Sequence, residues 1–374
     1  KYSYTSVEYS AAKVIDSIDL NGLIEIGADN SISLKYIADF FDSKSSFSDF
    51  NDTQIAKNHI NNGIDAYDVI QFCKDKFKWY LLRGYLLNEK AIIFGSSGQD
   101  GIFLQRLCKI RKIDCICLTN NKDGDVRSYQ LVSDIIRREN PNYVFNLSAK
   151  SSTKHELVMD NHEIISTGAL NILESVKNFS PKSKVFIVGS GLQFKNNEIP
   201  ISEEDEFEAR DPYSVARIHS TYASRYYKNL GLKIYIGYLF NHDSQFRSLN
   251  SVSQKVVQFV KQIESKGNYT LEIGNIDVKK EWGYAEDIAA GILDLVAQND
   301  FYEAVIGTGI AYSIEEWLEI CFKYYGFNWK DFVKIKSSYT PEYKILVSKP
   351  SKMMSIGWKA KVDIEHLANI MINH

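Results

Sequence analysis

The chain has 374 residues, but it contains only 6 prolines, 4 methionines and no long apolar run. No stretch approaches the roughly 20 consecutive apolar residues of a transmembrane helix, so we expect no membrane span. The first twenty residues lack a basic segment followed by an apolar one, so we expect no secretory leader. With 23 tyrosines and 20 phenylalanines against so few prolines, the composition favours an ordered globular protein over a disordered one.

The sequence also lacks an excess of basic residues and a regular cysteine pattern. Lys+Arg 44 against Asp+Glu 47 gives a net charge of −3, which argues against a generally basic nucleic-acid-binding protein. The 5 cysteines are odd in number and include no Cys-x-x-Cys. This pattern argues against a disulfide framework or a metal site and favours free thiols in a reducing compartment. We therefore expect a cytoplasmic protein.

The pattern of apolar residues changes near residue 89. Residues 1–88 predict a helical N-terminal appendage without a catalytic constellation. After it, apolar strand candidates alternate with helical patterns, which predicts an α/β fold with a Rossmann-type doubly wound parallel sheet. The strand candidates are 90–94, 113–118, 142–147, 184–188 and 233–239. The helical patterns are 102–112, 128–139, 161–178, 213–229, 251–266, 284–297, 313–325 and 363–373.

A glycine pattern, Gly95-x-x-Gly98-x-x-Gly101, lies between the first strand candidate and the first helix. Glycines at this spacing allow a tight turn and let a pyrophosphate approach the backbone amides at the start of the helix. The pattern therefore indicates a phosphate-binding turn. A tight strand–helix turn without a ligand is the alternative.

Further motifs follow in a fixed order along the chain. They are Asn146-Leu-Ser-Ala-Lys-Ser-Ser152, Asp211-Pro-Tyr-Ser-Val-Ala-Arg217, Asn241-His-Asp-Ser244, the run from Gly274-Asn-Ile-Asp to Glu281-Trp-Gly-Tyr-Ala-Glu-Asp287, Gly307-Thr-Gly-Ile-Ala-Tyr-Ser313 and Ser351-Lys-Met-Met-Ser-Ile-Gly-Trp358. In this order and spacing, the chain resembles the extended short-chain dehydrogenase/reductase family, and within it the GDP-mannose 4,6-dehydratases. The resemblance covers about residues 90–373 and leaves 1–88 uncovered.

The resemblance implies a division of labour between two parts. Residues 89–240 would form the Rossmann-type domain that binds NAD or NADP, and residues 241–374 a small nucleotide-sugar-binding lobe, partly interleaved with it. The implied cofactor-binding residues are Gly95, Ser97, Gly98, Gln99, Asp100, Gly101, Asp125, Ser148 and Ala149. The implied substrate-binding residues are Asn241, His242, Arg247, Lys255 and Lys280. For these, the alternatives are surface charges and, for Asn241 and His242, a role in backbone geometry.

The chain departs from the family pattern at its catalytic positions. Tyr213 matches the family's active-site tyrosine, and a nearby cation would lower the pKa of its phenol. Arg217 stands at the position of the family's lysine, which is not a conservative exchange at a positioned site. Gly189-Ser190-Gly191 stands in place of a Thr-Ser-Glu triplet, so Ser190 is the polar side chain left there. The candidate catalytic residues are therefore Tyr213, Arg217 and Ser190.

The adenine side of the expected cofactor site is also shortened. The strand ending at Leu118 is followed after a few residues by Gly124-Asp125, where the family pattern resumes. That gap cannot hold a helix and a strand of ordinary length. Thr119 and Asn120 follow the strand, in place of the acidic residue that holds a ribose diol. We therefore expect the third strand of the standard sheet to be missing.

Three functions are compatible with these observations. The first is a nucleotide-sugar dehydratase, epimerase or reductase that uses NAD(P), with GDP favoured by resemblance and surface-polysaccharide biosynthesis as the setting. The second is a transferase or hydrolase that acts on a nucleotide sugar without redox chemistry, because fold does not fix function. The third is a non-catalytic scaffold that binds a sugar nucleotide. The resemblance also implies a homodimer, because members of the family often pair through two long helices. The helices at 161–178 and 213–229 are the expected contacts.

Overall fold

A computed structural model describes residues 89–119, 123–263, 270–336 and 341–374. The chain divides into two units, residues 1–88 and 89–374, and everything below belongs to the second. The helical appendage expected over residues 1–88 lies outside the described residues, as does Asn120.

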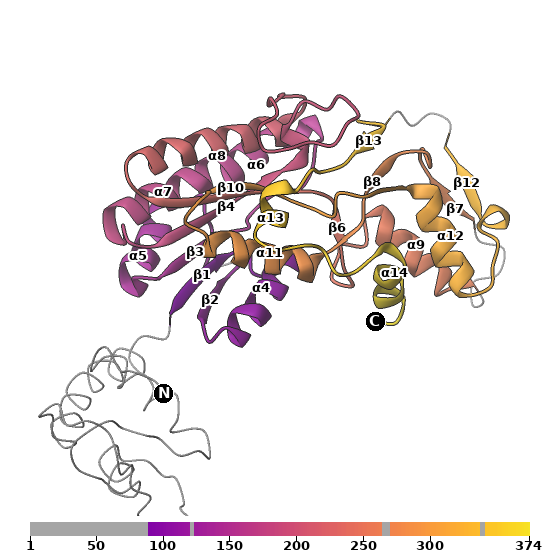
Figure 1. Ribbon diagram of the computed structural model, residues 1–374, viewed down its shortest axis with the longest axis horizontal. Coiled ribbons are helices and arrows are strands. Elements are labelled where there is room, and N and C mark those ends of the chain that lie inside the picture. The colour runs from indigo at the N-terminus through magenta and orange to yellow at the C-terminus, as the bar shows by residue number, and fades with distance from the viewer. Residues whose placement is uncertain (1–88, 120–122, 264–269, 337–340) are drawn as a thin grey trace, which may run out of the picture. The chain divides into compact units, whose positions relative to one another are not determined.

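A six-stranded parallel sheet forms the centre of the described unit (Figure 1). Its strands are β1 (Lys90–Phe94), β2 (Asp114–Leu118), β3 (Tyr143–Asn146), β4 (Lys184–Ser190), β5 (Lys233–Leu239) and β10 (Glu303–Ile306). The order across the sheet is β10-β5-β4-β3-β1-β2. Successive strands are added in opposite directions on either side of β1, and ligands of such sheets bind beyond the carboxyl ends at this switch point.

Helices cover both faces of the sheet because its strands are apolar on both faces. Ala91 and Ile93 of β1 pack with residues of α4, α11 and α13, whereas Ile92 and Phe94 pack with residues of α5 and α7. The helices are α4 (Gln99–Ile110), α5 (Tyr129–Glu139), α6 (Val158–Asn161), α7 (Gly168–Phe179), α8 (Pro212–Asn229), α9 (Val252–Val260), α11 (Ala285–Ala297), α12 (Ile314–Tyr324), α13 (Ser351–Ser355) and α14 (Ile364–Ile372). Among the described helices, none is long and apolar enough to cross a bilayer.

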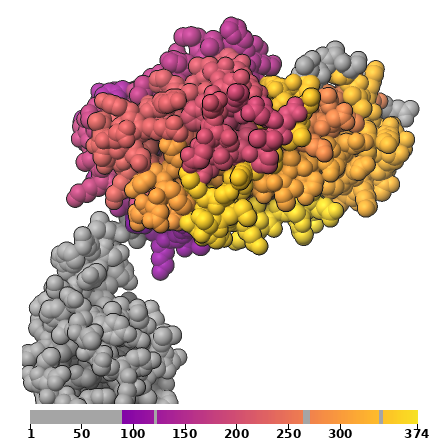
Figure 2. All heavy atoms as spheres, turned by 45° about the horizontal axis from the view of Figure 1, so that its top comes forward, coloured from indigo at the N-terminus to yellow at the C-terminus, as the bar shows by residue number. Residues whose placement is uncertain are grey.

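A second core lies among α9, α12 and α14. Trp282 stacks on Trp317 at its centre, with ring centroids 4.5 Å apart. The strands outside the main sheet are β6 (His242–Asp243), β7 (Leu271–Ile273), β8 (Lys279–Glu281), β9 (Gly283–Tyr284), β11 (Ala311–Ser313), β12 (Val333–Ile335) and β13 (Ile345–Leu346). The C-terminal segment, yellow in Figures 1 and 2, packs on β10 through α13 and on α12 through α14, and so joins the two cores.

The predicted strands and helices of residues 90–240 are confirmed, with ends that differ by a few residues. Three details differ from expectation. The helix expected at 161–178 runs from α6 through a π-helical turn, His162–Thr167, into α7. The helix expected at 251–266 is described over Val252–Val260. β10 was not predicted, although it completes the main sheet beside β5.

Candidate active site at the carboxyl edge of the sheet

The predicted motifs meet where the parallel strands end. The glycine turn follows β1, Ser148 and Ala149 follow β3, and Ser190 is the last residue of β4. Asn241 follows β5, and Tyr213 lies in the first turn of α8. Because the carboxyl ends of parallel strands lie at one edge of a sheet, residues far apart in the sequence share a single site there.

Glycine occupies each of the three positions of the turn for a different physical reason. Gly95 has a φ of +80°, and a Cβ there would lie 2.9 Å from the Leu147 carbonyl carbon. A Cβ at Gly101 would lie 2.6 Å from the Ser96 Cα. At Gly98 the nearest atom would be 3.5 Å away, which is ordinary contact. Gly98 therefore leaves space above the first turn of α4, where no side chain caps the helix and the amides suit an anion.

Alanine substitutions at Gly101 and Gly98 should show which of these glycines the fold requires. Gly101→Ala must displace backbone atoms of the turn, so we expect it to destabilise the fold by about 1–3 kcal/mol in urea unfolding. Gly98→Ala meets no such clash, so its free energy of unfolding should change by less than about 1 kcal/mol. Equal losses for the two variants would show that the turn is not constrained as described.

The end of β2 anchors the glycine turn. The Leu118 carbonyl accepts hydrogen bonds from the Gly95 and Ser96 amides, both at 3.1 Å, and from the Ser96 hydroxyl at 3.0 Å. Among the described residues, β2 is the edge strand of the sheet, and residues 123–128 contain no helix or strand. Thr119 stands half-buried directly after β2.

Asp125, a predicted cofactor contact, is bound within its own loop. The Arg127 Nε and a terminal guanidinium nitrogen each lie 2.8 Å from its carboxylate oxygens. This hydrogen bonding holds the pKa of the Asp125 carboxyl below its usual range. An incoming adenosine group would have to compete with Arg127 for this carboxylate.

The glycines at 189 and 191 are required by the packing of aromatic rings. A Cβ at Gly189 would lie 2.5 Å from the ring of Tyr238, and one at Gly191 would lie 2.8 Å from the ring of Phe240. The Ser190 hydroxyl accepts a hydrogen bond from the Leu192 amide at 3.2 Å and so caps the short 3₁₀ turn Gly191–Gln193. The rings of Tyr238 and Phe240 therefore fill the volume that threonine at 189 and glutamate at 191 would need.

Tyr213 and Arg217 lie one turn apart on α8. Asp211 caps this helix by accepting the Tyr213 and Ser214 amides, and Pro212 occupies its first position, as is common at helix starts. The Arg217 side chain is 3% exposed, its guanidinium carbon lies 5.1 Å from the Tyr213 ring centroid, and it donates a 2.6 Å hydrogen bond to the Val188 carbonyl. Among the described residues, the Arg217 Nε has no hydrogen-bond partner.

Two of the predicted substrate-binding cations meet at Asp243. The Arg247 Nε lies 3.4 Å and the Lys280 Nζ 3.9 Å from its carboxylate, which also accepts the Ser253 hydroxyl at 2.6 Å. Burial would raise the pKa of Asp243, but the charges of Lys280 and Arg247 outweigh it and lower that pKa. Lys255, by contrast, is exposed on α9.

The first residues of α4 are tied to the segment after β5. The Gln99 side-chain Nε2 donates to the His242 backbone carbonyl at 3.2 Å, and the Ser244 hydroxyl donates to the Gln99 Oε1 at 2.9 Å. The Asp100 carboxylate lies 2.8 Å from the His242 Nε2. The side chains of Gln99 and Asp100, both predicted to contact a cofactor, thus form hydrogen bonds within the protein. Ser97 and Gly98 are exposed.

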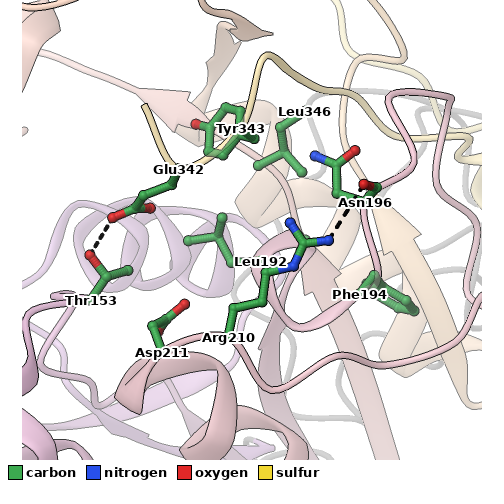
Figure 3. Close-up of a pocket in the computed structure, with 10 residues that line it drawn as sticks. Thr153, Leu192, Phe194, Asn196, Arg210, Asp211, Glu342, Tyr343 and Leu346 are labelled. Atoms are coloured by element: carbon green, nitrogen blue, oxygen red, sulfur yellow. Dashed lines mark hydrogen bonds between the residues drawn. The ribbon is translucent and has the colours of Figure 1, made fainter. Parts of the chain in front are cut away.

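A cavity of about 270 Å³ opens beside Gly191, at the end of the Gly189-Ser190-Gly191 segment (Figure 3). Its lining consists of Thr153, Gly191, Leu192, Phe194, Asn196, Arg210, Asp211, Glu342, Tyr343 and Leu346. The Thr153 hydroxyl donates to the Glu342 carboxylate at 2.6 Å at one side of the cavity (Figure 3). Neither residue was predicted, because two positions 189 residues apart give no local signal.

Comparison with known proteins identifies the family. The family model described as GDP-mannose 4,6 dehydratase matches residues 116–371. The chain belongs to the GDP-mannose 4,6 dehydratase family. GDP-mannose 4,6 dehydratase 2 of Arabidopsis thaliana is 30% identical over 259 residues, which cover 67% of this chain and 69% of that protein. The Dictyostelium discoideum GDP-mannose 4,6 dehydratase is 28% identical over 275 residues, 67% of this chain and 77% of its own length.

Solved structures support the fold of the family. RMD from Pseudomonas aeruginosa, complexed with NADPH, superposes with a TM-score of 0.68 at 18% identity, over 77% of this chain and 97% of that one. A Thermus thermophilus UDP-glucose 4-epimerase complexed with NAD gives 0.66 at 19% identity, over 76% and 98%. The Rossmann-type fold class predicted from the sequence is confirmed.

The residues present fit a dinucleotide in part. The open space over Gly98 and the uncapped start of α4 suit its diphosphate. Tyr213 and the cationic Arg217 lie one turn apart on α8, at the same edge of the sheet. On the adenosine side, the described residues offer Thr119 and an Asp125 already bound to Arg127. The fit is thus to the diphosphate and to the tyrosine end of the site.

Proposed function

We propose that this chain is an enzyme that modifies a hexose linked to a nucleoside diphosphate, with GDP as the nucleotide. The observation that carries the proposal is that the predicted groups all lie at one edge of the main sheet. In a chain of the GDP-mannose 4,6 dehydratase family, the glycine turn, the Tyr213–Arg217 pair and the Arg247–Lys280 pair lie beyond the carboxyl ends of the same sheet. Dehydration and epimerisation require removal of a sugar hydroxyl proton as its carbon is oxidised, whereas reduction of a ketosugar requires delivery of a proton to the carbonyl oxygen. In this proposal Tyr213 takes or supplies that proton.

Each group has a distinct part in the proposed reaction. NAD(P), when bound, supplies the hydride chemistry. The Gly98 turn would hold its diphosphate, and the Tyr213 phenolic oxygen would take or return the proton of a sugar hydroxyl. The Arg217 guanidinium carbon lies 5.1 Å from the Tyr213 ring centroid, so a cationic side chain stands beside the phenol that would react. The Ser190 hydroxyl accepts a hydrogen bond from the Leu192 amide and keeps its own proton, which it would donate to a sugar oxygen.

Arg247 and Lys280 should bind the sugar-nucleotide diphosphate. Charge-assisted hydrogen bonds are among the strongest that a protein offers an anion, so Arg247→Gln and Lys280→Gln should each weaken GDP-mannose binding by roughly tenfold or more. Lys334→Gln, an exposed lysine on β12, is the control and should leave the affinity unchanged. Isothermal titration calorimetry at fixed salt measures all three; unchanged affinity in both site variants would contradict the assignment.

A second candidate function is a non-redox reaction on the same nucleotide sugar. Two observations favour it: the buried Arg217 is committed to the Val188 carbonyl, and the Tyr238 and Phe240 rings fill the volume of the missing threonine and glutamate. Mass spectrometry of small molecules released by the denatured protein decides between the two. Released NAD(P) supports the redox enzyme, whereas turnover of GDP-mannose without any dinucleotide supports a transferase or hydrolase.

We also propose that the chain forms a homodimer through α7 and α8. The outer face of α8 exposes Val215, Tyr222 and Tyr226, with Tyr226 60% exposed, and Leu170 of α7 is partly exposed. Apolar side chains gathered on a helical face are typical of a subunit interface. Sedimentation equilibrium of the wild type and of Tyr226→Glu tests this, and a monomeric wild type would contradict it.

A further inference from the structure

The hydrogen bonds of His242 determine its protonation state. Its Nδ1 lies 2.7 Å from the Phe240 carbonyl oxygen, and its Nε2 lies 2.8 Å from the Asp100 carboxylate. A carbonyl oxygen and a carboxylate both accept hydrogen bonds, so each ring nitrogen must donate a hydrogen bond. Only the imidazolium form carries a proton on both nitrogens. The side chain is 10% exposed, and its charge is therefore held largely away from water.

The charges around His242 come from several elements. Asp100 reaches it from α4, and Arg247 faces it from the segment after β6. Arg217 of α8 faces Asp100, and Asp243 of β6 faces His242 while it binds Lys280 of β8. With His242 charged, four cations surround two carboxylates. This leaves an excess of positive charge beside the glycine turn and favours a bound anion.

The contact between Asp100 and His242 joins two parts of the site. Asp100 belongs to the helix that begins at the glycine turn, and His242 lies five residues before Arg247 in the sequence. The two further hydrogen bonds of Gln99 run parallel to this contact. If the imidazole loses a proton, one of its two hydrogen bonds must be lost with it, because a neutral ring has a single donor. The contact between α4 and the 242–247 segment then loosens and the positive charge falls.

We propose that Asp100 and His242 form a positioning pair that makes anion binding at Arg247 and Lys280 depend on the imidazolium of His242. This deepens the proposed function, since it rests on a nucleoside-diphosphate sugar as the ligand. Burial works against the charged ring, but the Asp100 carboxylate outweighs it and raises the pKa of His242. The link is therefore intact below that raised pKa, and affinity is lost as pH rises through it.

Calorimetry with GDP-mannose from pH 6 to 8.5 tests the pair. The diphosphate of this probe is a diester whose charge is constant over the range, so a change in affinity reports on the protein. We expect the affinity of the wild type to fall by roughly tenfold across the range. His242→Gln should bind weakly with a flat pH profile, and Asp100→Asn should move the fall to lower pH, because the carboxylate that favours the imidazolium is gone.

His366→Gln is the matched control. His366 also lies 2.8 Å from an aspartate, Asp363, but its side chain is 73% exposed at the start of α14. It should keep the affinity and the pH profile of the wild type. A pH-dependent fall that persists in His242→Gln would overturn the proposal, and so would a flat profile in the wild type.

The pH dependence of the melting temperature separates this inference from the substrate assignment. A histidine whose pKa is raised in the folded state stabilises the fold at low pH, and this contribution disappears as pH rises through that pKa. The wild type should thus melt above His242→Gln at pH 6, with a smaller difference at pH 8.5. A constant difference would overturn the pair itself. A changing difference without GDP-mannose binding at any pH would contradict the proposed substrate and the binding role.

Discussion

Tyr213→Phe should lower kcat by about 10²–10⁴-fold in an assay with GDP-mannose and NAD⁺ or NADP⁺, which is the usual range for loss of a general acid or base. The substitution removes only the phenolic oxygen. Tyr213 is half-buried in the first turn of α8, where the Asp211 cap and the Arg217 guanidinium fix its position. Because the ring is retained, KM should change far less than kcat.

Tyr222→Phe is the control for this experiment, because Tyr222 lies on the same helix with 58% of its surface exposed. It should keep the activity of the wild type. If Tyr213→Phe turned over substrate as fast as the wild type, the tyrosine would have no part in proton transfer. Arg217→Lys provides a further comparison, since it restores the family's residue while keeping the positive charge.

Glu281→Ala should destabilise the fold by about 3–5 kcal/mol, the range found when buried hydrogen-bond networks are broken. The Glu281 side chain is fully buried at the end of β8. Its carboxylate accepts the backbone amides of Thr308 at 2.5 Å, Gly309 at 3.2 Å and Ser348 at 2.5 Å. Removal of the carboxylate would leave the buried Ser348 amide and the partly buried Thr308 and Gly309 amides without this acceptor. A buried donor left unpaired costs about 1–3 kcal/mol.

Urea denaturation followed by tryptophan fluorescence measures this loss. Glu272→Ala is the matched control, because Glu272 pairs with Lys336 on an exposed part of β7 and its removal should leave stability nearly unchanged. A loss at Glu281 as small as that at Glu272 would mean that water reaches the three amides after substitution.

The regular elements were predictable because their patterns are local. The strand at 233–239 is observed with the predicted ends, and the helix at 213–229 differs by one residue at its start. β10, Glu303–Ile306, escaped prediction because its aliphatic run, Ala304–Ile306, is only three residues long and ends directly at Gly307. The π-helical turn at 162–167 also carries no signal distinct from an ordinary helix.

The roles of the candidate site residues stay predictions, but some of their neighbours are now visible. Tyr213 lies beside Arg217, and Arg247 and Lys280 both lie near Asp243. What could not be predicted depends on distant residues. The rings of Tyr238 and Phe240 explain the glycines at 189 and 191, but nothing near the triplet in the sequence points to them. The Asp100–His242 contact joins positions 142 residues apart and is equally invisible in a local pattern.

The position of β2 at the edge of the described sheet has a consequence for hydrogen exchange. β2 pairs on one side, with β1, and its Leu118 carbonyl holds the Gly95 and Ser96 amides. Edge strands open locally at a lower free energy than central ones, so we expect β2 and the glycine turn to open together. A ligand that binds the turn should then slow deuterium uptake along β2 as far as Asp114, at the end of the strand remote from the turn.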